Sequence, residues 1–308
     1  MNELELIARL TRSLPANATV VAGAGDDCAV LDCGQPGRYL LFKTDAVVEG
    51  VHFTSKAAPE QIGHKALGRC LSDVAAMAGR PLAALVTAAL PDNFSPAFVE
   101  RIYAGINGLA QRYGVAIAGG ETTRNPERLL LSIAMVGDVA REKCILRSGA
   151  KAGDALFVTG ELGGSLTGKH LEFEPRLAEA QWLAEHFSIH AMIDVSDGLA
   201  GDLRHLLQSS GVGAELMARA IPVSRAAELQ ARAESKPPLL AALGDGEDFE
   251  LLFTVGSGHA VALLDGWRKQ FPTLRLSCIG RITAERGLKL RDKTGLHPLE
   301  THGYVHFA

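Results

Sequence analysis

The sequence predicts a protein of the mixed α/β (α+β) class with two domains. Short β-like apolar runs alternate with stretches of helical periodicity along the chain, which argues against a helical bundle or an all-β sandwich. The 308 residues suffice for two domains of ordinary size. A polar, glycine-rich segment at 141–154 follows the last strand of the first half, so we expect domains at 1–140 and 141–308.

The first half is predicted to begin with a β-hairpin and to continue as helix, strand, helix and two strands. The turn-forming run Gly34-Gln35-Pro36-Gly37 joins the hairpin strands. An apolar stripe predicts the first helix, which Gly79-Arg80-Pro81 ends, and Gly114 ends the second. The strand after Gly114 is expected to be buried. In chain order, the predicted ranges are 28–31, 39–44, 62–77, 82–90, 98–113, 115–118 and 129–136.

The second half is predicted to alternate strands and helices in the same way. A strand at 155–159 is followed by a glycine-rich stretch and by a helix after Pro175. The remaining elements are a strand at 191–195, a helix at 198–208 and two final strands at 249–255 and 276–282, which complete this unit.

Composition excludes several classes of protein. With 47% hydrophobic and 21% charged residues, the chain can bury a core and is not predominantly disordered. Lys and Arg total 31 against 35 Asp and Glu, and the net charge of -4 gives no basic field for a nucleic acid or a membrane surface. The longest apolar stretch, 82–90, is far shorter than the roughly 18 residues of a membrane helix.

The expected location is cytoplasmic, because the first residues lack a basic secretory region. Cysteine usage agrees with this expectation. Five scattered cysteines, with no Cys-x-x-Cys pair, predict reduced thiols rather than disulfides or a zinc site.

Acidic residues gather in glycine-containing segments at the ends of predicted strands. The hairpin places Asp27, at the entry of one strand, opposite Asp45, at the exit of the other. Neighbouring carboxylates repel and raise each other's pKa, so such a cluster needs cations. Oxygen ligands favour Mg²⁺, which also binds substrate phosphates. A phosphate-handling site is therefore predicted from Gly25-Asp26-Asp27, Lys43-Thr44-Asp45, Leu71-Ser72-Asp73, Gly119-Gly120-Glu121-Thr122-Thr123, Ile193-Asp194-Val195-Ser196-Asp197-Gly198 and Gly244-Asp245-Gly246-Glu247-Asp248.

Single acids also have structural explanations. Asp73 follows Arg69 by four residues, as in an exposed helical ion pair. Asp26 and Asp27 are turn formers after Gly25. Each alternative stays open for its residue alone, whereas the combination of acids favours the metal site.

Three other features have alternatives of the same kind. The segment Ser196-Asp197-Gly198 is placed to cap the following helix and Asp202 to complement its dipole in the first turn, although the N–H groups at a helix start also bind phosphate. The segment 244–250 equally fits a solvated loop before a strand. His52 is more often a half-buried structural histidine than a substrate ligand.

The segment Gly163-Gly164-Ser165-Leu166-Thr167-Gly168-Lys169-His170 nearly matches a P-loop. A P-loop requires a Ser or Thr hydroxyl for Mg²⁺ at the last position, where this chain has His170. We therefore exclude a Walker-type fold and leave open whether this glycine loop borders a nucleotide. Gly23-Ala24-Gly25 lacks the third glycine of a Rossmann fingerprint.

Taken together, the acidic segments resemble the thiamine-monophosphate kinase family. The matching blocks run in family order from residue 25 to residue 307. They are Gly25-Asp26-Asp27-Cys28-Ala29-Val30, Thr44-Asp45, Glu49-Gly50-Val51-His52-Phe53, Lys65-Ala66-Leu67, Leu71-Ser72-Asp73-Val74-Ala75-Ala76-Met77, Gly119-Gly120-Glu121-Thr122-Thr123-Arg124, Arg147-Ser148-Gly149-Ala150-Lys151, Ile193-Asp194-Val195-Ser196-Asp197-Gly198-Leu199, Gly246-Glu247-Asp248-Phe249-Glu250-Leu251 and Gly303-Tyr304-Val305-His306-Phe307.

The resemblance implies the two-domain fold shared with aminoimidazole-ribonucleotide synthetase. In that fold an N-terminal domain forms the sheet of a homodimer, and a C-terminal α/β domain completes the nucleotide and substrate site. The implied reaction is direct in-line transfer of the ATP γ-phosphoryl group to thiamine monophosphate, giving thiamine diphosphate and ADP. The acceptor is already an ionised phosphate, so the obstacle is charge repulsion, which several Mg²⁺ ions between the domains lower.

By matching position, the resemblance assigns roles to single residues. The family usually has Asp where this chain has Glu121, and Gly244-Asp245-Gly246 varies the usual lead-in to Glu247. The implied catalytic residues are Asp73, Arg147 and Asp194; the nucleotide contacts are Gly119, Gly120, Arg147 and Ser196; the acceptor contacts are His52, Glu247 and Tyr304; and the metal residues are Asp27, Lys43 through its backbone, Thr44, Asp45, Asp73, Glu121, Asp194 and Asp197.

Three other functions stay open. Another member of the superfamily, such as selenophosphate synthetase or aminoimidazole-ribonucleotide synthetase, is disfavoured by the segment 49–53, by Tyr304 and by the lack of a reactive-cysteine glycine loop near the N-terminus. A nonenzymatic Mg-nucleotide sensor is disfavoured by residues for both metal and acceptor. A metal-dependent phosphohydrolase differs in releasing free phosphate.

Overall fold

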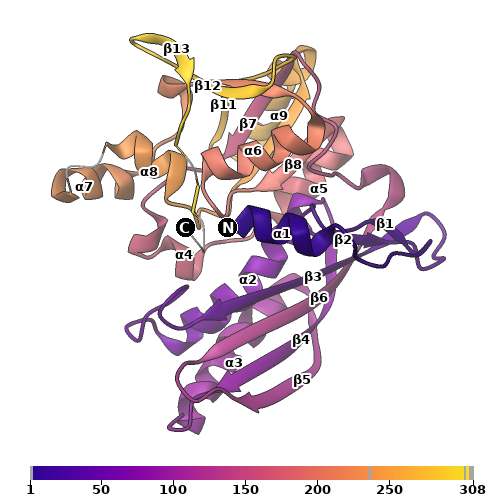
Figure 1. The fold of residues 1–308 in the computed structure, drawn as a ribbon, viewed down its shortest axis with the longest axis vertical. Coiled ribbons are helices and arrows are strands. Elements are labelled where there is room, and N and C mark those ends of the chain that lie inside the picture. The colour runs from indigo at the N-terminus through magenta and orange to yellow at the C-terminus, as the bar shows by residue number, and fades with distance from the viewer. Residues whose placement is uncertain (1–2, 235–236, 302, 305–308) are drawn as a thin grey trace.

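The computed structural model describes residues 3–234, 237–301 and 303–304. Its two β-sheets lie toward opposite ends of the molecule, one built by the first half of the chain and the other by the second (Figure 1). The predicted mixed α/β class is confirmed. The boundary at 140/141 stays a prediction, and it falls in the connection between the two sheets.

The first sheet has the order β1-β2-β3-β6-β4-β5 and is antiparallel except for the pair β4 and β5. Helices α2 (Pro59–Ala76) and α3 (Pro96–Tyr113) pack on one face, and the opposite face is open over β3, β6 and β4 (Figure 1). The strands are β1 (Val20–Ala22), β2 (Ala29–Leu31), β3 (Arg38–Val48), β4 (Arg80–Leu90), β5 (Ala116–Arg124) and β6 (Leu130–Ala140).

The second sheet has the order β13-β12-β9-β11-β7-β10-β8 and is antiparallel except for the pair β9 and β12. Every residue of its inner strand β7 is buried, because helices cover both faces. The strands are β7 (Asp154–Thr159), β8 (Ile189–Asp194), β9 (Gly213–Met217), β10 (Leu251–Gly256), β11 (Leu276–Thr283), β12 (Gly287–Asp292) and β13 (Gly295–Pro298).

Two hydrophobic cores follow from this layering. Phe157 of β7 packs with α5 (Leu177–His186) and α9 (Ala260–Gln270), in a core that continues into the first sheet. Its neighbours Leu156 and Val158 point to the other face, toward α6 (Leu199–Ser210) and α8 (Pro238–Gly244). The remaining α-helices in the described residues are α1 (Glu3–Thr11), α4 (Lys169–Glu172) and α7 (Arg225–Glu234).

The strongly patterned elements form as predicted. β2 and β3 pair as the expected antiparallel hairpin. Helix α3 ends at Gly114, whose φ of 67° is the left-handed conformation typical of a glycine helix stop. None of the helices in the described residues is long and apolar enough to cross a membrane. The five cysteines are free thiols, as predicted.

Two predictions about the fold are wrong. The strand expected to be buried at 115–118 is β5, an edge strand that is largely exposed and runs on through the two glycines to Arg124. The strands β10 and β11 do not complete the second half, because β12 and β13 follow, and β9 was missed. Alternating polar side chains and short length leave these missed strands without a strong apolar signal.

Candidate active site

Three carboxylates from distant parts of the chain meet where its two halves pack together. Asp27 precedes β2, Asp73 lies in the last turn of α2, and Asp194 is the last residue of β8. One oxygen of each lies within 4.8 Å of the other two, and all three side chains are buried. The Ser72 hydroxyl donates to Asp194 Oδ2 at 2.6 Å and so links α2 to the second sheet.

The electrostatics of this cluster call for a cation. Burial and the nearby Asp27 raise the pKa of Asp194 to about 7. Burial also raises the pKa of Asp73, and the neighbouring acids Asp45, Asp194 and Asp27 add to that rise against the opposing effect of Lys43. Among the described residues, the buried Oδ2 of Asp27 has no hydrogen-bond partner. An orphaned carboxylate oxygen facing other acids is the arrangement that an oxygen-preferring divalent ion stabilises.

Basic side chains surround the acids without neutralising all of them. Lys43 Nζ lies 3.0 Å from Asp73 Oδ1 and 3.7 Å from Asp45 Oδ2. Arg69 reaches Asp45 Oδ1 at 3.5 Å. Burial opposes the ionisation of Asp45, but Lys43 and Arg69 outweigh it and keep the pKa of Asp45 below its ordinary value.

Arg147 supplies the cation on the other side of the cluster. Its Nη2 lies 2.6 Å from Asp27 Oδ1, and its backbone N–H donates to the Asp26 carboxylate at 3.2 Å. Burial and the adjacent Asp27 raise the pKa of Asp26 to about 6. Asp26 therefore holds the Arg147 backbone, while the guanidinium faces Asp27.

A pocket next to the cluster collects the residues expected to hold the acceptor. Its wall includes Leu166 and Phe249, and the polar lining is formed by His52, Arg69, Ser196, Asp197, Asp245, Glu247 and Tyr304. His52 Nδ1 accepts from the backbone N–H of Val48 at 3.1 Å, so the half-buried histidine is also satisfied structurally.

The C-terminal tail reaches this pocket by close packing on α6. The backbone N–H of Tyr304 donates to the Asp197 carbonyl at 2.7 Å. A Cβ on Gly303 would lie 2.4 Å from that same oxygen, so only glycine allows this approach. Of the tail block quoted above, Val305, His306 and Phe307 lie outside the described residues.

Some of the metal and nucleotide residues that the resemblance implies lie away from the cluster of Asp27, Asp73 and Asp194. The Thr44 side chain is exposed on the face of β3 opposite Lys43 and Asp45, and its hydroxyl lies 3.4 Å from that of Ser132. Gly119, Gly120 and Glu121 lie in the edge strand β5, three strands from β3, or about 14 Å at the usual spacing. Their implied roles stay predictions.

The structure contradicts one of the structural alternatives from the sequence and bears out part of another. Asp73 is no exposed helical pair, because it is buried and its ion pair is with Lys43, whereas Arg69 contacts Asp45. The N-cap of α6 is Gly198, the last residue of the expected cap segment, and no side chain caps the helix. Asp202 lies in the first turn, as predicted, and also accepts from the backbone N–H of Asp197 at 3.0 Å.

The segment 244–250 is not simply a solvated loop either. Asp248 and Glu250 are fully buried. The Asp248 carboxylate accepts from the backbone N–H of Gly163 at 2.9 and 3.0 Å, and Ser165 Oγ donates to the Glu247 carbonyl at 2.6 Å. The P-loop-like glycine segment is therefore packed against the acceptor pocket.

Sequence reasoning missed two basic residues of the site. Lys65, Arg69 and Asp73 recur at four-residue spacing on α2 and so share one face of the helix. That face is buried between the two halves instead of facing solvent. The signal in the sequence that could have found these two residues is a charged stripe on an otherwise apolar helix.

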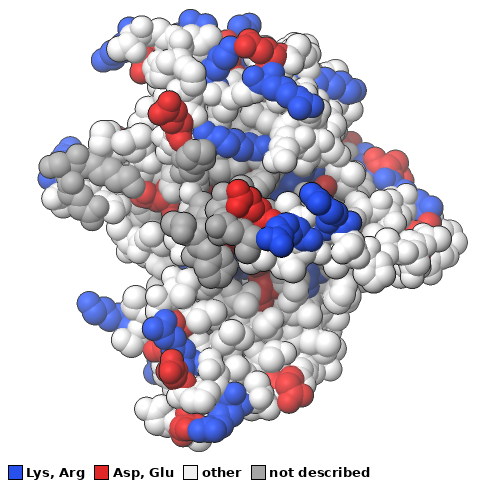
Figure 2. Space-filling view, viewed as in Figure 1, with Lys and Arg blue, Asp and Glu red and all other residues white. Residues whose placement is uncertain are grey.

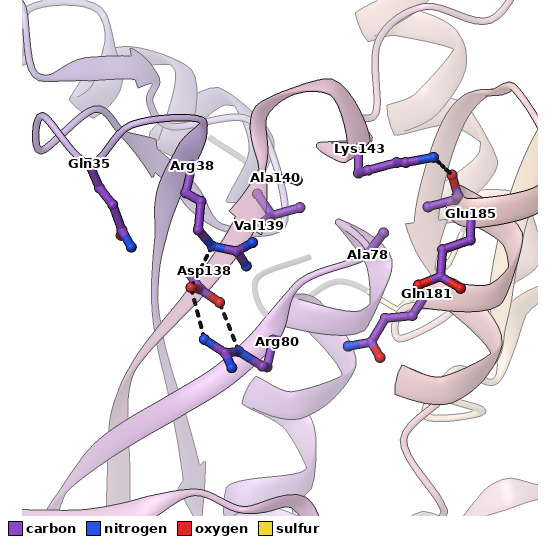
Figure 3. A pocket seen from close by; sticks show the side chains of 11 residues that line it. Gln35, Arg38, Ala78, Arg80, Asp138, Val139, Ala140, Lys143, Gln181 and Glu185 are labelled. Carbon is purple, nitrogen blue, oxygen red and sulfur yellow. Dashed lines mark hydrogen bonds and ion pairs between the residues drawn. The ribbon is translucent and has the colours of Figure 1, made fainter.

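A second cavity shows how differently a buried acid can be placed. It holds about 420 Å³ and lies between the first half of the chain and α5 (Figure 3). Asp138 accepts from Arg38 Nε at 2.7 Å and from Arg80 Nε and Nη2 at 3.1 Å each. Its carboxylate is thus satisfied by two guanidinium groups, and this cavity is no candidate metal site.

Comparison with known proteins assigns this architecture to a family. The N-terminal domain of the AIR synthase related proteins matches residues 25–139, and the C-terminal domain of the same group matches residues 151–293. The chain is 41% identical over 304 residues to a thiamine-monophosphate kinase of Rhodopirellula baltica, covering 96% of this chain and 93% of the relative. It is 34% identical to that of Escherichia coli K12, covering 99% and 98%.

Solved structures agree with these relatives. A structure described as AaThiL complexed with AMPPCP and TMP is 30% identical, with a TM-score of 0.82 and coverage of 99% and 97%. The hydrogenase maturation protein HypE of E. coli, at 20% identity and a TM-score of 0.74, shares the fold alone. The chain therefore belongs to the thiamine-monophosphate kinase family, within the AIR synthase related proteins.

Proposed function

We propose that this protein transfers the γ-phosphoryl group of ATP directly to thiamine monophosphate, forming thiamine diphosphate and ADP. The observation that carries the proposal is the convergence of Asp27, Asp73 and Asp194 within 4.8 Å, beside a pocket lined by His52 and Glu247. The relatives' names and the complex of AaThiL with AMPPCP and TMP support it.

The residues present fit Mg²⁺. Asp27, Asp73 and Asp194 offer clustered carboxylate oxygens, one of them without a partner in the described part of the chain. Asp45, whose charge acts on Asp73, and Asp197, which lines the neighbouring pocket, would extend the set. Bound Mg²⁺ would lower the repulsion between the two phosphorylated substrates and stabilise charge on the phosphate oxygens. The number of ions and the participation of Lys43, Thr44 and Glu121 belong to this proposal.

The chain's own residues orient the reactants. Arg147, held by Asp26 and Asp27, gives the nucleotide phosphates a fixed guanidinium, and no group has to act as a strong general base because the acceptor phosphate is already ionised. His52, Glu247 and Tyr304 position the organic part of the acceptor. This pocket holds about 90 Å³, far less than the roughly 300–1,000 Å³ of typical ligand sites, so either its side chains move apart or part of the acceptor stays outside it.

The proposal includes a cytoplasmic homodimer formed through the open face of the first sheet. Phe42 and Leu85 are each 48% exposed there, and Figure 2 shows few charged side chains over β3, β6 and β4. A sheet face that carries few charges and exposes large apolar residues suits an isologous contact with a second copy. Light scattering should give twice the 32.6 kDa chain mass, and Leu85→Arg should give the monomer; a wild-type monomer at micromolar concentration contradicts the dimer.

The deciding experiment is a mass-resolved product assay with ATP, Mg²⁺ and thiamine monophosphate. We expect equal amounts of ADP and thiamine diphosphate, and a large loss of turnover in Asp73→Asn. Free phosphate in place of thiamine diphosphate would indicate a phosphohydrolase, and product only from another acceptor would indicate a different superfamily activity. Tight ATP binding without any product would favour a sensor. Near-normal turnover of Asp73→Asn would remove Asp73 from the metal set.

A further inference from the structure

Lys65 is a fully buried cation at the back of the acceptor pocket. Its side chain is 0% exposed, although it belongs to α2 in the first half of the chain. The Nζ atom lies 2.6 Å from Glu247 Oε2 and donates to the His52 carbonyl at 2.5 Å. One ammonium group therefore joins α2, the segment that carries His52 and the segment that carries Glu247.

Burial of this lysine is costly, so stability alone does not explain it. Removing an ammonium from water carries a large desolvation penalty, and burial lowers the pKa of Lys65 to about 8. Buried ion pairs are often no more stabilising than apolar residues of similar volume. The surrounding face of α2 is packed with apolar side chains such as Ile62 and Ala66, where an apolar residue would fit the core.

The partner of Lys65 sits on an unusually constrained backbone. Glu247 has a φ of 56° and Phe249 a φ of 52°, in the left-handed region that residues other than glycine rarely adopt. Several contacts hold this conformation: the Glu247 N–H donates to the Ser196 carbonyl at 2.7 Å, and the Phe249 ring stacks on Phe173 with centroids 3.8 Å apart. Such strain typically marks a functional site whose side-chain direction matters.

These contacts point the Glu247 side chain across the seam between the two halves, where Lys65 meets it. Without Lys65, the carboxylate would remain partly buried without that cation and would turn toward water or Arg69, whose charge already acts on it. The His52 carbonyl would lose its charged donor in the same step. Two of the three residues expected to hold the acceptor depend on one side chain.

We propose that Lys65 is a positioning residue of the acceptor site, holding Glu247 and the His52 segment in the geometry that binds the organic part of the acceptor. The inference rests on the proposed function and names the recognised group. A fixed carboxylate suits a positively charged heterocycle that carries an amino group, as thiamine monophosphate does. Lys65 touches neither the nucleotide site nor the carboxylates of the Asp27, Asp73 and Asp194 cluster in the contacts described here.

The test compares Lys65→Met with the wild-type enzyme in steady-state kinetics for both substrates. Loss of positioning should raise the KM for thiamine monophosphate by ~10–100-fold, while the KM for ATP changes less than about twofold. Calorimetric titration with thiamine monophosphate alone should show the same weakening. A merely structural role predicts a lower melting temperature with the two KM values moving together.

Three further variants sharpen the test. In a double-mutant cycle, Lys65→Met with Glu247→Gln should be no worse than the poorer single variant, because both remove one contact. Lys65→Gln retains a neutral donor and should fall between wild type and Lys65→Met. Lys143→Met is the matched control: it removes a lysine whose Nζ donates to the Ala184 carbonyl at 2.7 Å beside the second cavity, away from the acceptor pocket, and should leave the acceptor KM unchanged.

An unchanged acceptor KM in folded Lys65→Met overturns the inference, as does an equal rise in both KM values. If Lys65→Met does not fold, a wild-type acceptor KM in Lys65→Gln overturns it. Additive effects of Lys65→Met and Glu247→Gln in the double-mutant cycle also overturn the inference. Failure of the proposed function is distinct, because the wild-type enzyme would then form no thiamine diphosphate.

Discussion

Two buried aspartates of the same chain illustrate opposite uses of a carboxylate. Asp138 on β6 and Asp194 on β8 are both 3% exposed. Burial opposes the ionisation of Asp138, but hydrogen bonds from Arg38 and Arg80 outweigh it and lower its pKa (Figure 3). Asp194 receives a hydroxyl from Ser72 and faces Asp27, and its pKa rises to about 7.

Because two equally buried aspartates have pKa values shifted in opposite directions, burial alone does not identify a functional acid. What separates the two residues is the sign of the charges around them. Both oxygens of Asp138 accept from guanidinium groups, so nothing further is needed to stabilise its charge. The cluster of Asp27, Asp73 and Asp194 places like charges together and leaves one oxygen unpartnered, which is unfavourable until a cation binds.

We expect the largest contrast in activity when each of the two aspartates is replaced by asparagine in turn. Asp194→Asn should lower kcat/KM for thiamine diphosphate formation by ~100-fold or more, because it removes a charge aimed at the phosphoryl-transfer site. Its free energy of unfolding without Mg²⁺ should stay equal or rise, since repulsion from Asp27 is removed. Asp138→Asn should keep activity within about threefold and lose about 1–3 kcal/mol of unfolding free energy.

Product assays and denaturant unfolding on both variants check this prediction. If Asp138→Asn loses activity as severely as Asp194→Asn, the division between a structural and a functional acid is wrong. A marked loss of stability in Asp194→Asn without Mg²⁺ would show that its carboxylate is already well satisfied by the protein.

The sequence was sufficient for the parts of the molecule governed by local chemistry. Continuous apolar runs marked β7 and the core of β10, a glycine marked the end of α3, and the acids at strand ends marked Asp27 and Asp194 of the cluster. These signals depend on residues close together in the chain. The resemblance added the expected roles of single residues, and all of those roles stay predictions.

The remainder depends on contacts between distant residues. Whether the stripe of Lys65, Arg69 and Asp73 faces water or the second half is decided by packing such as that of Ser72 on Asp194, 122 positions later. A local pattern cannot distinguish these cases, and the exposed ion pair of Arg69 and Asp73 was the simpler local interpretation. The exposure of β5 likewise follows from its place at the sheet edge, which sequence periodicity does not encode.

The two aspartates should also make opposite contributions to the pH dependence of stability. The folded pKa of Asp194 lies near 7, above its ordinary value of 3.8, so the folded state binds more protons than the unfolded state between about pH 4 and 7. Stability of the metal-free protein should therefore fall as pH rises through this window. Asp138 has the opposite sign: its contribution is present above its ordinary pKa and is lost only as pH falls through its lowered value.

Thermal unfolding with chelator and with excess Mg²⁺ measures this effect. We expect the metal-free melting temperature to be lower at pH 8 than at pH 6, and Mg²⁺ to raise it by at least a few degrees at pH 8 but less at pH 6, where protons compete for the carboxylates. Asp194→Asn should flatten both dependences. Equal stabilisation by Mg²⁺ at the two pH values would contradict a cluster that titrates in this range.

The smallest effect concerns the hydroxyl that holds Asp194. Ser72→Ala removes the 2.6 Å hydrogen bond to Asp194 Oδ2 and leaves every carboxylate of the cluster in place. Partners that orient metal ligands typically contribute 10–100-fold in metal affinity or activity, so the Mg²⁺ concentration for half-maximal rate should rise ~10-fold while the rate at saturating Mg²⁺ stays within about threefold. Ser277→Ala, which removes another buried hydroxyl that accepts from Arg275, is the control. An identical Mg²⁺ dependence in Ser72→Ala and the control would mean that Asp194 needs no orienting partner, and the contrast with Asp138 would then rest on charge alone.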